Sequence, residues 1–333
     1  MNHNDTYAVN FLDRIRRTRG SNLCKSSFDQ SEKRSRQNAL RLINDDRLQF
    51  ATLFILQEEI GKLDLKQDLS ERNQIALDIC EKTTDKKDAL SASVHPLQLK
   101  SDKVRSVLRW IFLSGAADDG LSDEFDQILD AAAAVLIKTH QEKSVLPVVV
   151  DLIFRRNRKG KYHHDLIWAF FQTEDASALR FIAGYLRSPN KKDVDLARTL
   201  LNLQQDTPMS TNTLRQKEYV EYLAWLKENA PYLCFTGKNF QFSNSPVPCE
   251  LDVDAKYLCK GISNPHKKTA HPFTEEESIR LNNLHDAQPE ERTALANYSS
   301  TLYGKDKQRW SEWMQYPVEK QMQTAQYGRR KLV

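Results

Sequence analysis

The stretch SDEFDQILDAAAAVLIKTH, residues 122–140, decides the fold class. Its apolar side chains recur at the i, i+3, i+4 and i+7 positions that form one face of an α-helix. Ser122 stands where an N-cap residue is expected, and Asp123 and Glu124 follow in the first turn, where negative charge suits the positive end of the helix dipole. The stretch therefore predicts an amphipathic helix. Its predicted core face consists of Phe125, Ile128, Leu129, Ala132, Ala133 and Leu136.

Further helical segments follow this helix along the chain. Residues 145–154 are almost wholly apolar, and Pro147 falls in the first turn of the predicted helix, where its missing N–H does least harm. The β-branched run Val148–Val150 would also suit a buried strand, which stays open as the alternative. Later helices are predicted around residues 165–171, 179–186, 194–201 and 219–226. Helix pairs thus recur about every 30–40 residues, which is within the range of helical solenoids.

One junction between these helices resembles a known repeat family. In ALRFIAGYLRSPNKKDVDLARTLLNL, residues 178–203, an apolar helix ends at Leu186 and a short loop with Pro189 follows. The next helix opens with Asp193 and carries Arg198. This order resembles the junction between two HEAT-type repeats. The resemblance implies an all-α fold, an α-solenoid of HEAT-like helix pairs, and an irregular α-helical bundle is the alternative.

Changes in composition predict five segments along the 333 residues. The polar first segment is expected to be a flexible arm, and the third is the helical-repeat core. The fourth is an irregular or β-containing insertion with a linker, and the second and fifth are helical. The predicted boundaries are 1–35, 36–90, 100–229, 230–272 and 273–333.

The insertion near residues 232–260 interrupts the helical pattern with alternating aromatic residues and turn residues. Residues 232–235 and 240–242 are predicted to pair across Gly237 as a small hairpin. Two prolines beyond it argue against any further central strand.

Capping chemistry predicts several helix ends. Asp46 and Gly61 are expected to start and stop one helix, and Thr173 is expected to cap another. Thr274 and Glu277 have the spacing of a capping box.

Composition narrows the protein class. Hydrophobic residues make up 40% of the chain and charged residues 28%, which is typical of a soluble globular protein. The formal net charge of +4 is too small to indicate a nucleic-acid-binding field over the whole molecule. The five cysteines, a polar first 20 residues and the lack of a long apolar run predict a cytoplasmic protein without a membrane segment.

Cysteine and histidine residues after position 230 raise the question of a metal site. Zinc sites usually contain close ligand pairs such as C-x2-C. No cysteine pair here has that spacing, so these residues are predicted to be ordinary thiols and polar groups, without a metal or cofactor. The residues weighed are Cys234, Cys249, Cys259, His266 and His271.

The adjacent pair His163-His164 is followed by Asp165. Adjacent helical residues do not face each other, so the pair is interpreted as polar residues at a helix N-terminus. No catalytic motif is recognised elsewhere, and no catalytic residue is assigned.

A basic stretch is the most distinctive surface feature, and we predict it to be a loop. Its charges could neutralise phosphates, and the alternative is a solvated inter-helix loop that complements a helix C-terminus. The candidate binding residues are Arg155, Arg156, Arg158, Lys159, Lys161 and Tyr162.

Three functions from different classes are compatible with these features. The first is a non-enzymatic helical-repeat protein that binds a protein partner as scaffold, adaptor or assembly subunit. The second is a nucleic-acid-binding protein similar to HEAT-like DNA glycosylases, which would need an acidic residue facing a Trp-lined cleft. An enzyme with a dispersed site is the third interpretation.

Overall fold

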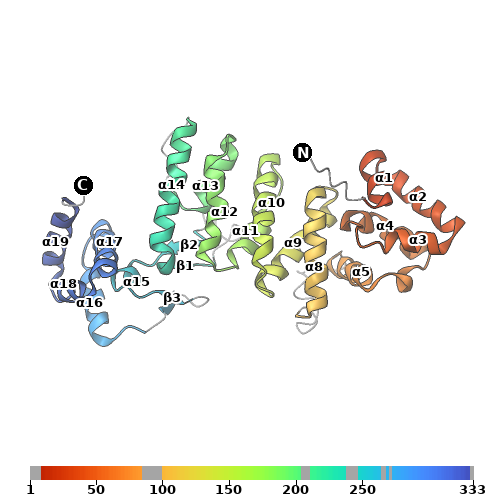
Figure 1. The fold of residues 1–333 in the computed structure, drawn as a ribbon. Coiled ribbons are helices and arrows are strands. Elements are labelled where there is room, and N and C mark those ends of the chain that lie inside the picture. The colour runs from red at the N-terminus through yellow and green to blue at the C-terminus, as the bar shows by residue number, and fades with distance from the viewer. Residues whose placement is uncertain are drawn as a thin grey trace, which may run out of the picture. The chain divides into compact units, whose positions relative to one another are not determined.

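A computed structural model shows an all-α fold, in which the described residues form helices and a few short strand pairs (Figure 1). The chain divides into two compact units, Met1–Thr173 and Glu174–Val333, and each is described by itself. This division falls inside the predicted repeat core, residues 100–229. The structure describes residues 9–84, 100–203, 211–237, 247–263, 268–269 and 272–330.

Unit 1 is built from helices that pack on their neighbours in the chain. α1 packs on α2, and α2 packs on α3 and α4; α8 contacts α4, α5 and α9, and α11 contacts both α9 and α10. The helices are α1 (Phe11–Arg19), α2 (Ser21–Arg34), α3 (Arg36–Ile43), α4 (Phe50–Lys62), α5 (Glu71–Thr84), α8 (Asp102–Gly115), α9 (Asp123–Lys138), α10 (Leu146–Lys159) and α11 (His164–Phe171), with the 3-10 turns η1 (Lys66–Asp68), η2 (Ala116–Asp118) and η3 (Lys143–Val145).

The helix predicted from residues 122–140 is confirmed as α9. The Ser122 hydroxyl accepts a hydrogen bond from the Phe125 N–H at 3.2 Å, which satisfies one of the free N–H groups of the first turn. The six predicted face residues are all buried. Gly115 at the end of α8 lets this helix approach closely, because a Cβ there would lie 2.8 Å from Leu129 Cδ2.

Residues 146–159 form helix α10, so the strand alternative for this segment is wrong. Pro147 lies in its first turn, as predicted. Leu146, Val149 and Phe154 are buried. The β-branched run is accommodated because the apolar helix α11 packs against this segment.

The expectation of a flexible arm is wrong for residues 11–34, which form α1 and α2. Leu12, Cys24 and Phe28 are fully buried. The segment is rich in charge, but its few apolar residues fall on one face of each helix, and that face packs on α3 and α4.

The predicted ends of α4 are also wrong. The helix begins at Phe50 and not near Asp46, and it ends at Lys62 and not at Gly61. The Phe50 N–H donates to Ser114 Oγ at 3.1 Å, and the preceding N–H donates to Asp13 Oδ2 at 3.1 Å. Side chains from α8 and α1 therefore satisfy the first turn of α4, and no local capping residue is needed.

Unit 2 contains short helices, two strand pairs and a C-terminal group of helices. The short helical elements are η4 (Ala176–Ala178), α12 (Leu179–Ala183), η5 (Gly184–Arg187), α13 (Lys191–Leu200), η6 (Ala230–Tyr232) and α15 (Val253–Tyr257). The longer helices are α14 (Asn212–Asn229), α16 (Glu275–His285), α17 (Pro289–Lys305), α18 (Lys307–Trp313) and α19 (Val318–Arg330). The strands are β1 (Leu233–Phe235), β2 (Cys249–Leu251), β3 (Ile262–Ser263) and β4 (Lys268–Thr269).

Strand β1 lies in the predicted place but pairs with a different segment. It pairs antiparallel with β2, with Leu233 opposite Leu251 and Phe235 opposite Cys249. The predicted partner, residues 240–242, lies outside the described residues. The two prolines that argue against a further central strand come before β2 in the sequence. The residues of β2 itself therefore keep their N–H groups for the strand pair.

Capping predictions in unit 2 have mixed outcomes. The capping box of Thr274 and Glu277 is confirmed at the start of α16. Thr173 does not cap the next helical element and lies buried after α11. Asp175 caps η4 in its place, because its side chain accepts a hydrogen bond from the Ser177 N–H at 2.9 Å. Asn190 ends the predicted break before α13 by accepting a hydrogen bond from the Lys192 N–H.

The C-terminal helices share their own core. Trp313 is buried there with Tyr257 and Met314, and Trp310 packs against the cluster. The Trp310 indole N–H also donates to Ser299 Oγ at 2.7 Å. The two tryptophans thus serve as core contacts. In the part of the chain that the structure describes, no helix combines the length and apolar character needed to cross a bilayer.

Candidate functional site

The basic stretch predicted as a loop is largely helical. α10 continues through Lys159, and Gly160 ends it in the left-handed conformation with φ of 66°. Arg156, Arg158 and Lys159 therefore occupy the last turn, where positive charge complements the helix dipole. The sequence did not reveal that the helix extends this far, because Gly160 is the one local residue that marks its end.

Arg156 is not a surface residue, which corrects its place in the predicted binding patch. Its side chain is 2% exposed, and its guanidinium lies 2.7 Å from Asp119 Oδ1 and 2.9 Å from Asp130 Oδ2. Two buried carboxylates share this one cation. Burial consequently raises the pKa of Asp130 to about 7, against the attraction of Arg156. A phosphate could reach this guanidinium only by breaking a buried ion pair.

Other members of the predicted patch also contact groups in unit 1. Arg155 donates to the Ala116 carbonyl at 3.1 Å, and Lys161 lies 3.6 Å from Asp126. The Tyr162 hydroxyl donates to Asp165 at 3.0 Å. Arg158 is partly buried and Lys159 is exposed. The structure brings the six predicted residues to one end of α10, but carboxylates lie among them.

The histidine pair has a closer geometry than expected. The rings of His163 and His164 lie 5.2 Å apart, because His163 is the N-cap residue and has a non-helical backbone. Burial lowers the pKa of His163, so its ring is neutral at neutral pH. Among the described residues, no group of three His, Cys, Asp or Glu side chains is placed to hold a metal ion.

Cys249 and Cys259 in unit 2 are poor nucleophiles. Burial raises the pKa of the Cys249 thiol to about 12 and that of Cys259 to about 11. Thiols with such values are protonated at neutral pH and lack the reactivity of a thiolate. His266 and His271, the other members of the zinc set weighed above, lie outside the described residues.

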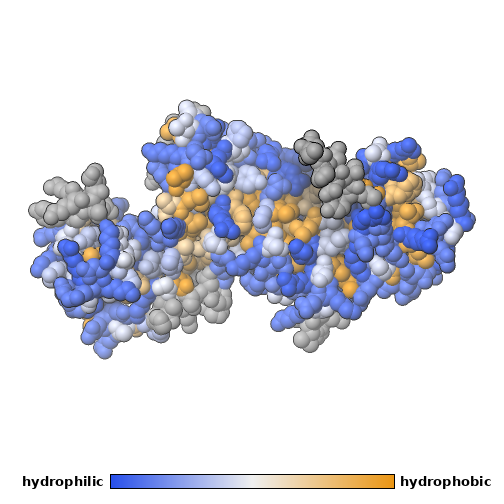
Figure 2. Space-filling view, in the orientation of Figure 1, coloured by the Kyte–Doolittle hydropathy of each residue, from blue (hydrophilic) through white to orange (hydrophobic). Residues whose placement is uncertain are grey.

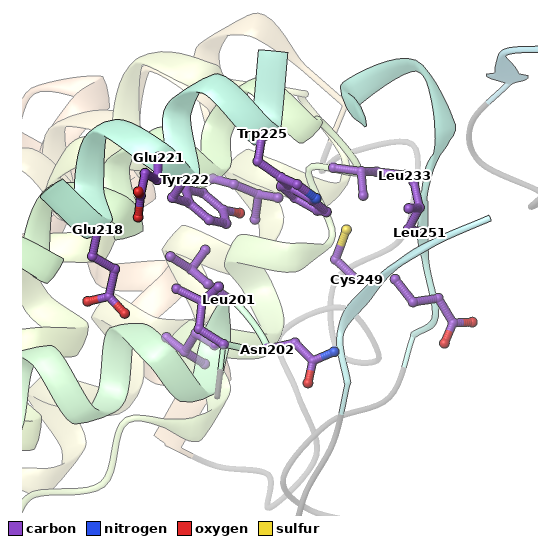
Figure 3. A pocket seen from close by; sticks show the side chains of 13 residues that line it. Leu201, Asn202, Glu218, Glu221, Tyr222, Trp225, Leu233, Cys249 and Leu251 are labelled. Atoms are coloured by element: carbon purple, nitrogen blue, oxygen red, sulfur yellow. The ribbon is translucent and has the colours of Figure 1, made fainter. Parts of the chain in front are cut away.

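A cavity that was not predicted from the sequence lies beside α14. It has a volume of about 430 Å³, and we call it the α14 pocket. Its walls come from α12, the C-terminal end of α13, one face of α14 and the strand pair β1–β2 (Figure 3). Its apolar lining includes Leu179, Leu200, Leu201, Leu203, Leu233 and Leu251.

An aromatic pair on α14 forms one wall of this pocket. The rings of Tyr222 and Trp225 stack with centroids 5.6 Å apart and planes 30° apart. Tyr222 is only 5% exposed, whereas Trp225 is 39% exposed. Figure 3 shows both side chains extending from α14 between Leu201 on one side and the strand residue Cys249 on the other.

The helix period explains which residues of α14 reach the pocket. At 100° per residue, Leu214, Glu218, Glu221 and Trp225 fall within a narrow stripe of the helix surface. Leu214 is 40% exposed, so apolar surface extends along α14 beyond the pocket. In Figure 2, apolar residues are visible beside α14, next to hydrophilic residues of the same helix.

Strand alternation orients the residues of β2. Cys249 and Leu251 lie on the same face of the strand as Leu233 opposite them, and all three line the pocket. Glu250 is directed to the other face, where the Cys234 thiol donates to it at 3.9 Å. Its carboxylate therefore does not face the pocket interior.

Two carboxylates on α14 give the pocket its charge. Glu218 is bound to the buried Arg198 at 2.9 Å. The Glu221 side chain is 65% exposed and has Lys217 at 3.7 Å. The described lining residues include no lysine, arginine or histidine. Glu221 is thus the carboxylate of α14 that remains accessible to a ligand.

The pocket chemistry suits binding more than catalysis. Burial raises the pKa of the Tyr222 phenol well above its usual range, and the Cys249 thiol is likewise protonated. The described lining therefore offers a large apolar surface and, on α14, the exposed carboxylate of Glu221, with no activated nucleophile.

Trp225 and Glu221 were missed because the sequence predicted only a helix around residues 219–226, whose apolar residues include Tyr222 and Leu226. The signal was the second stripe that contains Leu214 and Trp225. Comparisons with protein-family models, curated proteins and solved structures find no match.

Proposed function

We propose that this chain is a non-enzymatic helical-repeat protein that binds a protein partner through the α14 pocket. The observation that carries the proposal is the partly exposed Trp225, stacked on Tyr222 over a leucine-lined cavity. Tryptophan and tyrosine in apolar pockets dominate the binding energy of many protein interfaces. Scaffold, adaptor and assembly subunit are the roles that such a surface would serve.

The solenoid arrangement of HEAT-like helix pairs belongs to this proposal. In each unit, helices pack mainly on elements close to them in the chain, as repeat arrays do. The HEAT-like junction supports the same interpretation, because Leu186 is buried and the buried Asp193 accepts a hydrogen bond from Ser188 at 2.6 Å. The odd number of cysteines supports a reducing, cytoplasmic compartment.

The length of the apolar stripe favours a peptide segment over a compact small molecule. Leu214 and Trp225 are eleven residues apart on α14, which corresponds to about 16 Å along the helix axis. A helix or extended segment of a partner can follow such a stripe and insert one or two side chains into the pocket.

The nucleic-acid alternative has weaker support. The α14 pocket does place Glu218 and Glu221 beside a tryptophan, as a HEAT-like glycosylase would require. However, its described lining carries carboxylates and no cation, and such a surface repels phosphates. The predicted basic patch also has Arg156 in a buried ion pair. We therefore favour a protein partner.

A display library tests the proposal. A library of random 12-residue peptides is selected on the immobilised full-length chain and on two variants, Trp225→Ala and Val220→Ala. Val220 is the matched control, because it is 53% exposed and lies on another side of α14. We expect sequences to be enriched on the wild type and on Val220→Ala but not on Trp225→Ala. Equal enrichment on all three proteins, or none on the wild type, would reject the proposal.

A further inference from the structure

We infer that the partner segment is basic, with an apolar side chain in the α14 pocket and a lysine or arginine beside Glu221. This inference rests on the proposed function, since it specifies the chemistry of the partner at the same site.

The charges around the pocket differ in their availability to a ligand. Glu218 is 15% exposed and is bound to the buried Arg198 at 2.9 Å, so it is already neutralised. Glu250 also belongs to the lining, but strand alternation places its side chain on the face of β2 where the Cys234 thiol donates to it at 3.9 Å. Glu221 remains, and its contact with Lys217 at 3.7 Å joins two side chains that are 65% and 69% exposed. Such an exposed pair contributes little, so a ligand cation can replace Lys217.

The position of Glu221 relative to the aromatic pair favours a long cationic side chain. Glu221 and Trp225 are four residues apart, and side chains with that spacing are neighbours on a helix surface. A lysine or arginine can lay its methylene groups on the Trp225 ring while its charged end reaches the Glu221 carboxylate. An acidic side chain at this position would meet a carboxylate and the negative face of the ring.

The apolar part of the partner follows from the lining. Six leucines and the Tyr222–Trp225 pair form most of the lining of the cavity of about 430 Å³, with Asn202 and the glutamates as its polar members. An aliphatic or aromatic side chain therefore suits the part of the cavity that the leucines line. The inferred recognition element therefore combines one apolar anchor with a basic residue near it.

The same random 12-residue library provides the test, now selected on the wild type, Glu221→Lys and Glu312→Lys. Glu312 is the control, because it is an exposed glutamate on α18 in the same unit, away from the pocket lining. We expect lysine and arginine to be enriched near an apolar residue on the wild type and on Glu312→Lys. On Glu221→Lys this enrichment should disappear or reverse to acidic residues.

One selected peptide then measures the coupling. The peptide should bind Glu221→Lys about five- to tenfold more weakly than it binds the wild type. A peptide in which the basic residue is replaced by glutamate should bind Glu221→Lys well again and should bind the wild type weakly. Thermal melting of the variant should match that of the wild type.

The outcomes separate the inference from the proposed function. Trp225-dependent peptides without a basic preference, or with affinities unchanged by Glu221→Lys, would overturn the inference and leave the protein-binding proposal intact. An absence of any Trp225-dependent peptide would overturn both.

Discussion

Replacing Arg156 by glutamine should destabilise unit 1 by about 3–5 kcal/mol. Arg156 is 2% exposed and joins Asp119 and Asp130 at 2.7 and 2.9 Å. Glutamine cannot supply the positive charge, so two buried carboxylates would be left without a cation. The matched control is Arg155→Gln, because Arg155 is a quarter exposed and its ion pair is with an exposed carboxylate. We expect the control to cost about 1 kcal/mol or less.

The Arg156→Gln effect should depend on pH. The pKa of Asp130 is about 7 in the folded protein and ordinarily 3.8, so the folded state holds this proton more tightly than the unfolded state. The resulting stability is fully present below about pH 4 and is lost as pH rises through about 7. Removing the Arg156 charge raises this pKa further. The loss of stability should therefore be larger at pH 8 than at pH 5.

Hydrogen–deuterium exchange of the full-length chain measures this effect in each unit separately. Protection of peptides from α9 and α10 should fall roughly a hundred- to several-thousandfold, because each 1.4 kcal/mol corresponds to a factor of ten. Peptides from α16 and α17 in unit 2 serve as the internal control.

An Arg156→Gln protein within about 1 kcal/mol of the wild type at pH 8 would refute the ion-pair reasoning. The triple variant Arg156→Met, Asp119→Asn, Asp130→Asn removes all three charges. It should recover part of the lost protection, because no unpaired charge remains buried.

Three further predictions concern other parts of the chain. Ile182→Asp should cost several kcal/mol, seen as lost exchange protection in unit 2, because Ile182 is fully buried and the new charge has no partner. Gly115→Ala should cost about 1–3 kcal/mol in thermal unfolding, because the new methyl group would meet Leu129 Cδ2 at 2.8 Å; an unchanged melting temperature would show that α8 and α9 can separate freely. Changing Arg158 and Lys159 together to glutamine should leave DNA and RNA binding weak and nearly unchanged over a range of salt concentrations. Nanomolar wild-type binding that this double variant abolishes would favour the nucleic-acid alternative.

Local chemistry made part of the fold predictable. The Ser122 cap, the position of Pro147 and the Thr274 capping box each depend on residues within one helical turn, and the structure confirms all three. The all-α class followed from the helical period of the apolar residues in the same way.

Features that depend on distant residues were not predictable. The first turn of α4 is satisfied by Asp13 and Ser114, which are far away in sequence. Arg156 was interpreted as a surface charge because its partner Asp119 lies 37 positions earlier. A single sequence does not indicate which acidic residue a distant arginine will meet, so the buried ion pair could not be separated from a phosphate-binding patch.

The α14 pocket required the tertiary structure for a similar reason. Its walls come from five separate segments, and β2 supplies Cys249 and Leu251 only because it pairs with β1. The second apolar stripe of α14 is visible in the sequence. The pattern does not indicate, however, whether Trp225 on that stripe is buried or exposed.

Calorimetric titration of one selected peptide into the wild type, Trp225→Ala and Val220→Ala tests the central claim most directly. Loss of the Trp225 ring should weaken binding by about 30-fold or more, equivalent to the 2 kcal/mol of an interface hot spot. The Val220→Ala affinity should stay within about twofold of the wild type, because that side chain lies off the binding stripe. Equal dissociation constants for the wild type and Trp225→Ala would contradict the assignment of the α14 pocket as the partner-binding site.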